Sequence, residues 1–315
     1  MSLYGLFKGV GPSGFGYNST SDEVTAGLDL SGRTYVVTGC NSGLGEDVLR
    51  VLVARGARVI ATARTEEKAA QAIAGLDGPS GPGGSAGEAV PLACELSEPD
   101  SVRAAVKRVI ELGHPLAGII ANAGIMALPQ RTLKHGHELQ FLTNHIGHSI
   151  LVCGLLEQLD SDGRVVMLSS TAHVQAPSEG IRFDDVSFEK GYTGWTAYGQ
   201  SKLANLLFAK HLATRLPQPN QRACSVHPGV IWTNLGRHMP GFVQVIAGAL
   251  GPAVALKSVP QGSATELYVA THPDAGAHNG EYFADCNVAK PSANGRDAAL
   301  AARLWDETEK WMAAL

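Results

Sequence analysis

The stretch Thr34-Tyr-Val-Val-Thr-Gly-Cys-Asn-Ser-Gly-Leu-Gly45 decides the fold of this chain, because it joins a strand pattern to a helix pattern through a glycine-rich turn. The run up to Thr38 is mostly β-branched and apolar, and the residues from Glu46 to Arg55 have helical spacing. Glycines at such a turn let the backbone approach a pyrophosphate, which free N–H groups and the positive end of the helix stabilise. The spacing is G-x-x-x-G-x-G, and a plain tight turn is the alternative interpretation. Its position in the first strand–helix–strand unit favours the phosphate site.

Six further short apolar runs follow this stretch, and long helical patterns separate them. Most of these runs are apolar on both faces, which is typical of a parallel sheet covered by helices on each side. They are Ala57–Thr62, Ala89–Ala93, Leu116–Ala121, Arg164–Leu168, Arg222–Val226 and Gly280–Ala284. The sequence therefore predicts an α/β fold, a doubly wound parallel sheet of Rossmann type in a single domain over residues 30–315. Residues 1–29 form a polar, glycine-rich N-terminal arm that we expect to wrap on the surface or to fray.

Composition excludes several classes of protein. With 44% hydrophobic and 17% charged residues, the 315-residue chain is globular rather than disordered. A net charge of −4 disfavours a nucleic-acid surface. The five cysteines are isolated, and residues 1–16 lack the pattern of a secretory leader, so we expect a cytoplasmic protein with reduced thiols. The apolar stretch 242–256 is shorter than the roughly 20 residues of a membrane span, and no histidine spacing predicts a metal site.

The residues after the second strand indicate which dinucleotide the turn would bind. Sites for NAD usually end this strand with a carboxylate that accepts hydrogen bonds from the ribose hydroxyls. Here the position is occupied by Ala63, and the guanidinium of Arg64 follows. An arginine can pair with the 2′-phosphate of NADP(H), so NADP(H) is favoured over NAD(H). An ordinary solvent-exposed arginine at a helix start is the alternative.

A candidate for acid/base chemistry is the pair Tyr198 and Lys202, which share one face of a predicted helix. A free tyrosine is only about 0.1% ionised at pH 7, and an adjacent ammonium group lowers its pKa and favours the phenolate. Such a tyrosine can exchange a proton with an alcohol or carbonyl oxygen while hydride moves to or from a nicotinamide. The spacing alone is not specific, because Tyr4 and Lys8 repeat it.

Three further polar groups follow strands or lie in a helix in a suggestive order. The pair Ser169-Ser170 follows the Arg164–Leu168 run, Asn144 lies inside a helical pattern, and Asn122-Ala-Gly124 ends the fourth strand. Doubly wound folds bind ligands at this edge of the sheet. Taken singly, a turn serine, a solvent-facing asparagine and an ordinary turn explain them equally well.

Together these residues resemble the short-chain dehydrogenase/reductase family, from Leu30 to the C-terminus. The resemblance implies a catalytic tetrad in which Tyr198 is the acid/base and Lys202 lowers its pKa and holds the nicotinamide ribose. Ser170, the second serine of its pair, would steady the substrate oxygen, with Ser169 as the alternative, and Asn144 would hold a water that links Lys202 to solvent. The implied cofactor contacts, besides Tyr198 and Lys202, are Gly39, Asn41, Ser42, Gly43, Leu44, Gly45, Arg64, Glu95, Leu96, Asn122, Ala123, Gly124, Pro228, Gly229, Val230 and Thr233. Glu95 departs from the family, which usually has Asp there.

A narrower resemblance is to the retinol-dehydrogenase-like branch, which includes WW-domain oxidoreductases, although no WW domain is present here. It is carried by Asn144-His-Ile-Gly-His148, by Gly194–Phe208, and by Gly280-Glu-Tyr-Phe283. The branch typically uses NADP(H) and acts on lipophilic aldehydes, ketones or alcohols. The apolar segment 234–260 would then form a substrate lid, or else a core or dimer-contact helix.

The sequence thus predicts an NADP(H)-dependent oxidoreductase that interconverts a lipophilic alcohol and its ketone or aldehyde, as a homodimer or a monomer. Two alternatives stay open. One is a catalytically silent NADP(H)-binding sensor or interaction protein, and the other is a reductase of conjugated C=C bonds.

Overall fold

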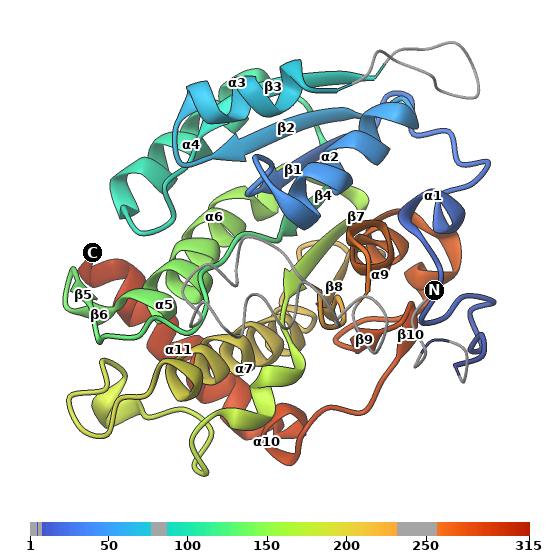
Figure 1. Ribbon diagram of the computed structural model, residues 1–315. Helices are drawn as coiled ribbons and strands as arrows, with labels where there is room; N and C mark the ends of the chain where they lie inside the picture. The colour runs from blue at the N-terminus through green and yellow to red at the C-terminus, as the bar shows by residue number, and fades with distance from the viewer. Residues whose placement is uncertain (1–4, 6–7, 77–86, 232–256) are drawn as a thin grey trace.

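A computed structural model describes residue 5 and residues 8–76, 87–231 and 257–315. Its centre is an eight-stranded sheet of order β10-β9-β8-β7-β4-β1-β2-β3 (Figure 1). Neighbouring strands are parallel except for β10, which pairs antiparallel with β9 at the edge. The strands of this sheet are β1 Thr34–Thr38, β2 Arg58–Ala63, β3 Glu88–Ala93, β4 Leu116–Ala121, β7 Leu159–Leu168, β8 Arg222–His227, β9 Tyr282–Ala284 and β10 Asn287–Val288.

The predicted doubly wound sheet is confirmed, and every predicted strand forms. The prediction was incomplete at the periphery. It missed β10 and the small antiparallel pair β5 Leu133–Lys134 and β6 His137–Glu138, and it started β7 too late. These are short or charged segments, which lack an apolar run for the sequence pattern to detect.

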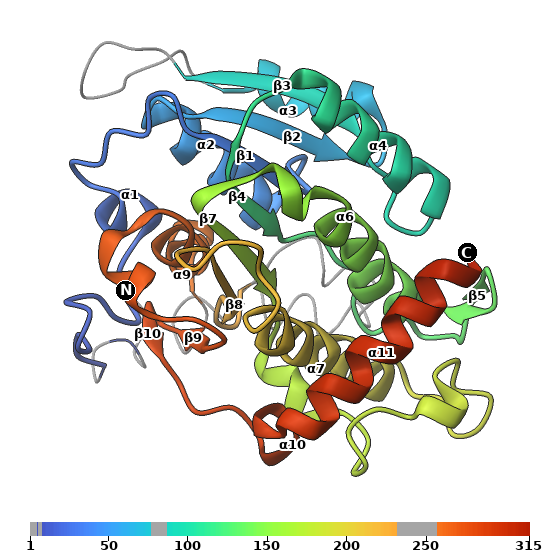
Figure 2. The same cartoon turned by 180° about the vertical axis from the view of Figure 1, so that it is seen from behind.

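Helices cover both faces of the sheet (Figures 1 and 2). Each face has its own core, because neighbouring strand residues point to opposite sides: Val36 joins the cluster with α4, α6 and α7, and Val37 joins the one with α2 and α9. The helices are α1 Ser21–Val24, α2 Gly43–Ala54, α3 Glu66–Ala74, α4 Pro99–Leu112, α5 Leu139–Phe141, α6 Gly147–Leu155, α7 Gly194–Leu212, α9 Val259–Thr271, α10 Ala293–Arg296 and α11 Ala298–Ala314. A π-helical turn, Leu142–Ile146, joins α5 to α6.

The C-terminal helix α11 covers the helices that carry Asn144 and Tyr198. Figure 2 shows it lying across α7. Trp305 of α11 stacks on Phe208 of α7 with ring centroids 5.0 Å apart, and Thr308 lies 2.9 Å from the Nε2 atom of His145. The chain's own last helix therefore fills the outer surface of this layer.

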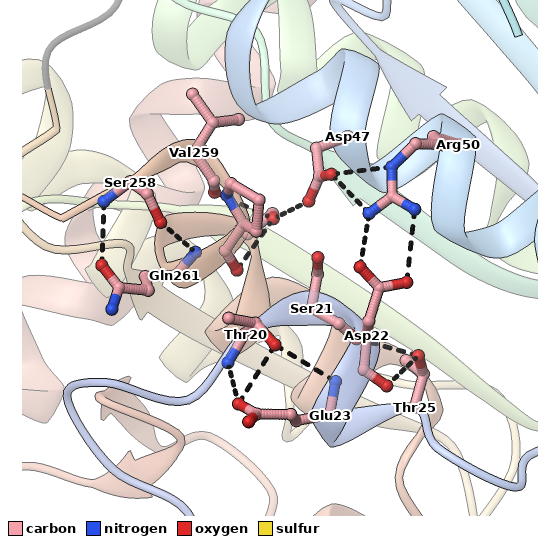
Figure 3. A network of polar contacts seen from close by, with 12 residues as sticks. Thr20, Ser21, Asp22, Glu23, Thr25, Asp47, Arg50, Ser258, Val259 and Gln261 are labelled. Carbon is pink, nitrogen blue, oxygen red and sulfur yellow. Dashed lines mark hydrogen bonds and ion pairs between the residues drawn. The ribbon is translucent and has the colours of Figure 1, made fainter. Parts of the chain in front are cut away.

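The described part of the N-terminal arm is docked on α2 and α9 through a polar network (Figure 3). Thr20 caps α1, and Asp22 of that helix pairs with Arg50 of α2 at 2.8 Å. Arg50 also pairs with Asp47, whose other oxygen accepts a hydrogen bond from Ser263 of α9. The network joins the arm to the helix that follows the glycine-rich turn.

In the described part of the chain, one helical stretch, Leu139–Gln158, has the length and apolar composition of a membrane span. Within its most apolar window, 78% is buried inside the fold, and core helices of this kind pass the same test. The stretch packs against β4 and α4 as part of the sheet's cover.

Candidate active site

The glycine-rich turn lies against the Asn122–Gly124 loop at the carboxyl edge of the sheet. Gly39 has φ +74°, and a Cβ atom there would lie 2.9 Å from the Cβ of Ala123. A Cβ on Gly45 would collide with the carbonyl oxygen of Gly39. The Nδ2 atom of Asn122 donates to the Thr38 carbonyl at 2.7 Å. Glycine is therefore required at both positions by close backbone approach.

A cavity of about 260 Å³ lies beside this turn. Eleven residues predicted from the sequence line it: Gly39, Asn41, Ser42, Gly43, Leu44, Arg64, Glu95, Leu96, Asn122, Ala123 and Gly124. The lining also includes residues that sequence reasoning did not assign to a site: Ala63, Cys94, Ser97, Ile125, Leu139, Thr143 and Leu168. Only Ala63 and Leu168 carried a signal: Ala63 occupies the position of the usual ribose-binding carboxylate, and Leu168 ends a predicted strand.

Other predicted contacts lie outside this lining. Gly45 packs behind the turn, and Pro228, Gly229 and Val230 follow β8. Thr233 and most of the segment 234–260 lie outside the described residues.

Arg64 and Glu95 stand at one end of the cavity, after β2 and β3. Arg64 is exposed. One carboxylate oxygen of Glu95 accepts hydrogen bonds from the backbone N–H and the hydroxyl of Ser97, at 3.2 and 3.0 Å. Because a carboxylate repels an anion, Arg64 is the charged side chain of this lining that can pair with one.

The structure brings Tyr198, Lys202 and Ser170 together next to the cavity, and none of the three is part of its lining. The Nζ atom of Lys202 lies 5.7 Å from the centre of the Tyr198 ring and donates to the Leu168 carbonyl at 2.9 Å. The Ser170 hydroxyl accepts a hydrogen bond from the Ala172 N–H at 3.1 Å and lies near enough to the Tyr198 phenol to lower its pKa. The hydroxyl of Ser169 instead donates to the Lys202 carbonyl at 2.8 Å. Leu168 lines the cavity, so this group adjoins it.

Asn144 lies in the π-helical turn, fully buried. Its Oδ1 atom accepts from the Ile125 N–H at 2.8 Å, and its Nδ2 atom donates to the Ile125 carbonyl and to Ser201, each at 2.9 Å. Asn144 therefore fixes the loop after Gly124 against α7. The implied role of holding a water stays a prediction.

His148 is a site residue whose position sequence reasoning did not predict. Its Nδ1 and Nε2 atoms lie 2.9 Å from the Asn144 carbonyl and from the Thr38 hydroxyl, respectively. A carbonyl only accepts, so Nδ1 carries the proton, and burial lowers the pKa of His148 to about 4, which keeps the ring neutral. Nε2 then accepts from Thr38, whose oxygen accepts from the Ala123 N–H at 3.0 Å. One side chain thus links the glycine-rich turn to the π-helical turn.

The pKa values in the group differ from the expectation that Lys202 would lower that of Tyr198. Burial raises the pKa of Tyr198 to about 12, and the neighbouring hydroxyl of Ser170 offsets this rise in part. Burial also lowers the pKa of Lys202 to about 8, and the nearby charge of Glu266 opposes that change. The physical reason is loss of water around both groups, which disfavours each charged form. The resting phenol is therefore protonated at neutral pH.

Comparison with known proteins bears on this arrangement. Residues 33–182 match the family model for short chain dehydrogenase. The chain is 41% identical to the short-chain dehydrogenase TIC 32 A, chloroplastic, of Brassica napus over all of both chains. It is also 35% identical to mouse (Mus musculus) retinol dehydrogenase 12, over 90% of this chain and 87% of that one. The chain belongs to the short-chain dehydrogenase/reductase family.

The fold agrees with that membership. A crystal structure of an uncharacterized protein from Mycobacterium paratuberculosis superposes with a TM-score of 0.71 and 32% identity, covering 92% of this chain and 97% of that one. The resemblance to short-chain dehydrogenases/reductases is thereby confirmed, and so are the retinol-dehydrogenase-like relatives. The chain is an oxidoreductase of this family.

Proposed function

We propose that this protein is an NADP(H)-dependent oxidoreductase that interconverts a lipophilic alcohol and its ketone or aldehyde. The observation that carries the proposal is that Tyr198, Ser170 and Lys202 come together beside Leu168, which lines the same cavity as Arg64. A dinucleotide suits this cavity, because Gly43 at the N-terminus of α2 lines it and Arg64 supplies a charge for a 2′-phosphate. When bound, it supplies or accepts the hydride.

The protein's own side chains then stabilise the substrate's carbonyl oxygen and transfer one proton to it. In reduction, Tyr198 donates its phenol proton to the carbonyl oxygen as that oxygen becomes an alkoxide. Ser170 donates a second hydrogen bond to the same oxygen, and the ammonium of Lys202 stabilises the phenolate that forms. A phenol whose pKa is raised to about 12 is already in the protonated form that reduction requires.

A carbonyl panel tests the proposal. The purified protein is mixed with NADPH or NADH and a series of aliphatic and aromatic ketones and aldehydes, and coenzyme absorbance is followed. We expect turnover that is faster with NADPH and rises with the apolar size of the substrate. Tight NADPH binding without turnover would favour the sensor alternative. Reduction of an enone to its saturated ketone would favour the C=C reductase.

We also propose the cytoplasm as its location. All five cysteines are free thiols, and four of them are buried, which suits a reducing compartment. Imaging of a fluorescent fusion in the source cell tests this. A plastid signal would contradict the proposal and would agree with the name of the chloroplastic relatives.

A further inference from the structure

Trp195 is an exposed aromatic side chain next to the proposed acid/base. It lies in the first turn of α7 and is 41% exposed, whereas Tyr198 is 7% exposed. The two rings meet edge to face, with centroids 6.1 Å apart and an interplanar angle of 77°. An indole leaves a large apolar area in water at this exposure, which is costly unless something covers it.

Helix geometry places Trp195 on the catalytic face of α7. At about 100° per residue, its direction differs from that of Lys202 by about 20° and from that of Tyr198 by about 60°. Side chains of a helix tilt toward its N-terminus, so Trp195 lies one turn beyond the phenol, on the side away from Lys202.

The neighbours of α7 show what this direction faces. On one side of Trp195, Gly194 packs on the loop after Gly124, since a Cβ there would lie 2.9 Å from the Ala127 carbonyl carbon. On the other side, Gly199 packs on the turn after Ser170, since a Cβ there would lie 2.7 Å from the Ala172 carbonyl oxygen. Trp195 points between these two segments. Its ring lies 6.1 Å from that of Tyr198, so a group attached to a carbonyl at the phenol can reach the indole.

We propose that Trp195 is a specificity-determining residue that binds a planar apolar substituent of the substrate, an aryl or conjugated group next to the carbonyl. The inference rests on the proposed function and narrows its substrate class. A rigid indole presents apolar area at a low entropic cost, and an aromatic pair adds attraction beyond area burial. A flat substituent gains both, whereas a flexible alkyl chain gains only the area term.

A matched pair of substrates tests this, namely phenyl methyl ketone and a straight-chain methyl ketone of similar carbon number. We expect the parent to prefer the phenyl ketone in kcat/KM. Trp195→Ala should lower the phenyl-to-alkyl ratio roughly three- to tenfold, mainly through KM for the phenyl ketone, and Trp195→Phe should keep most of it. Ile110→Ala, which alters an exposed side chain on α4, is the control and should leave the ratio unchanged.

Equal loss for both ketones, or a loss seen only in kcat, would overturn the inference, because either result indicates a structural role. Titration calorimetry of phenyl ketone binding in the presence of NADP⁺ separates this from a failure of the proposed function. If the parent binds the phenyl ketone without turnover and Trp195→Ala binds it more weakly, the oxidoreductase proposal is wrong and the proposed role of Trp195 still holds. Absence of any such binding in the parent would sink the subsite.

Discussion

At the Gly39 end of the cavity the backbone forms the walls, because glycines and the Asn122–Gly124 loop approach each other too closely for side chains. At the Tyr198 end the walls are side chains, buried and hydrogen-bonded to distant segments: Lys202 to β7, Asn144 to the loop after β4. The glycines of the Gly39 end lie close together in sequence and lack side chains. The Tyr198 end is formed by contacts between segments far apart in the sequence. We expect the two ends to respond differently to substitution. Changes at the Gly39 end should alter the preference between NADPH and NADH, and changes at the Tyr198 end should lower the rate of the reaction.

The largest effect should come from Tyr198→Phe. Removing the phenol hydroxyl takes away the proton donor, and general acid catalysis accounts for about 10²- to 10⁴-fold in rate, so we expect turnover to fall roughly a thousandfold. The dissociation constant for NADPH, measured by fluorescence, should change less than about twofold, since Lys202 is kept and most predicted coenzyme contacts lie at the other end. Tyr268→Phe, on α9, is the matched control and should keep its activity. Unchanged turnover in Tyr198→Phe would refute the acid/base assignment.

The next effect belongs to the Gly39 end. Arg64→Asp replaces a cation with an anion, which repels a 2′-phosphate and suits free ribose hydroxyls. We expect the ratio of kcat/KM with NADPH to that with NADH to fall about 10- to 100-fold, because a charge-assisted hydrogen bond is worth about 1.5–3 kcal/mol. Arg108→Asp, an exposed change on α4, controls for net charge. An unaltered ratio would exclude Arg64 as the phosphate partner.

The same contrast explains what the sequence could reveal. The glycine-rich turn and the parallel sheet follow from patterns within a few residues, and both were predicted. Tyr198 and Lys202 share their spacing with Tyr4 and Lys8, so only the order of other polar residues along the chain pointed to them. The role of His148, the position of Trp195 and the raised pKa of Tyr198 depend on which segments pack together, and no local pattern carries that information.

A double-mutant cycle measures how far the two ends are connected. His148→Phe leaves the Thr38 hydroxyl and the Asn144 carbonyl without their imidazole partner, which should cost about 1–3 kcal/mol of stability in urea unfolding. Thr38→Val removes one of the same bonds, so the two losses should not add. We expect a coupling energy on the order of 1 kcal/mol. Additive losses would mean that the hydrogen bond between His148 and Thr38 contributes no coupling energy and that the two ends are independent.

The smallest effect concerns Glu266 on α9, which is fully buried and has no hydrogen-bond partner for either carboxylate oxygen among the described residues. Burial raises its pKa from 4.5 to about 8, so the folded protein holds a proton that the unfolded chain releases above about pH 4.5. Its contribution to stability is complete below that pH and is lost as the pH rises through 8.

Glu266→Gln removes this titration, so its Tm relative to the parent should rise by a few degrees between pH 5 and pH 8. Buried histidines such as His148 titrate in both proteins, so their effect cancels in the difference. Glu309→Gln, an exposed change on α11, should show a flat difference. A flat difference for Glu266→Gln as well would mean that this carboxyl group ionises normally, with a partner that offsets its burial. Glu266 would then be ionised at neutral pH. Its negative charge would raise the pKa of Lys202 and favour the ammonium form of that residue.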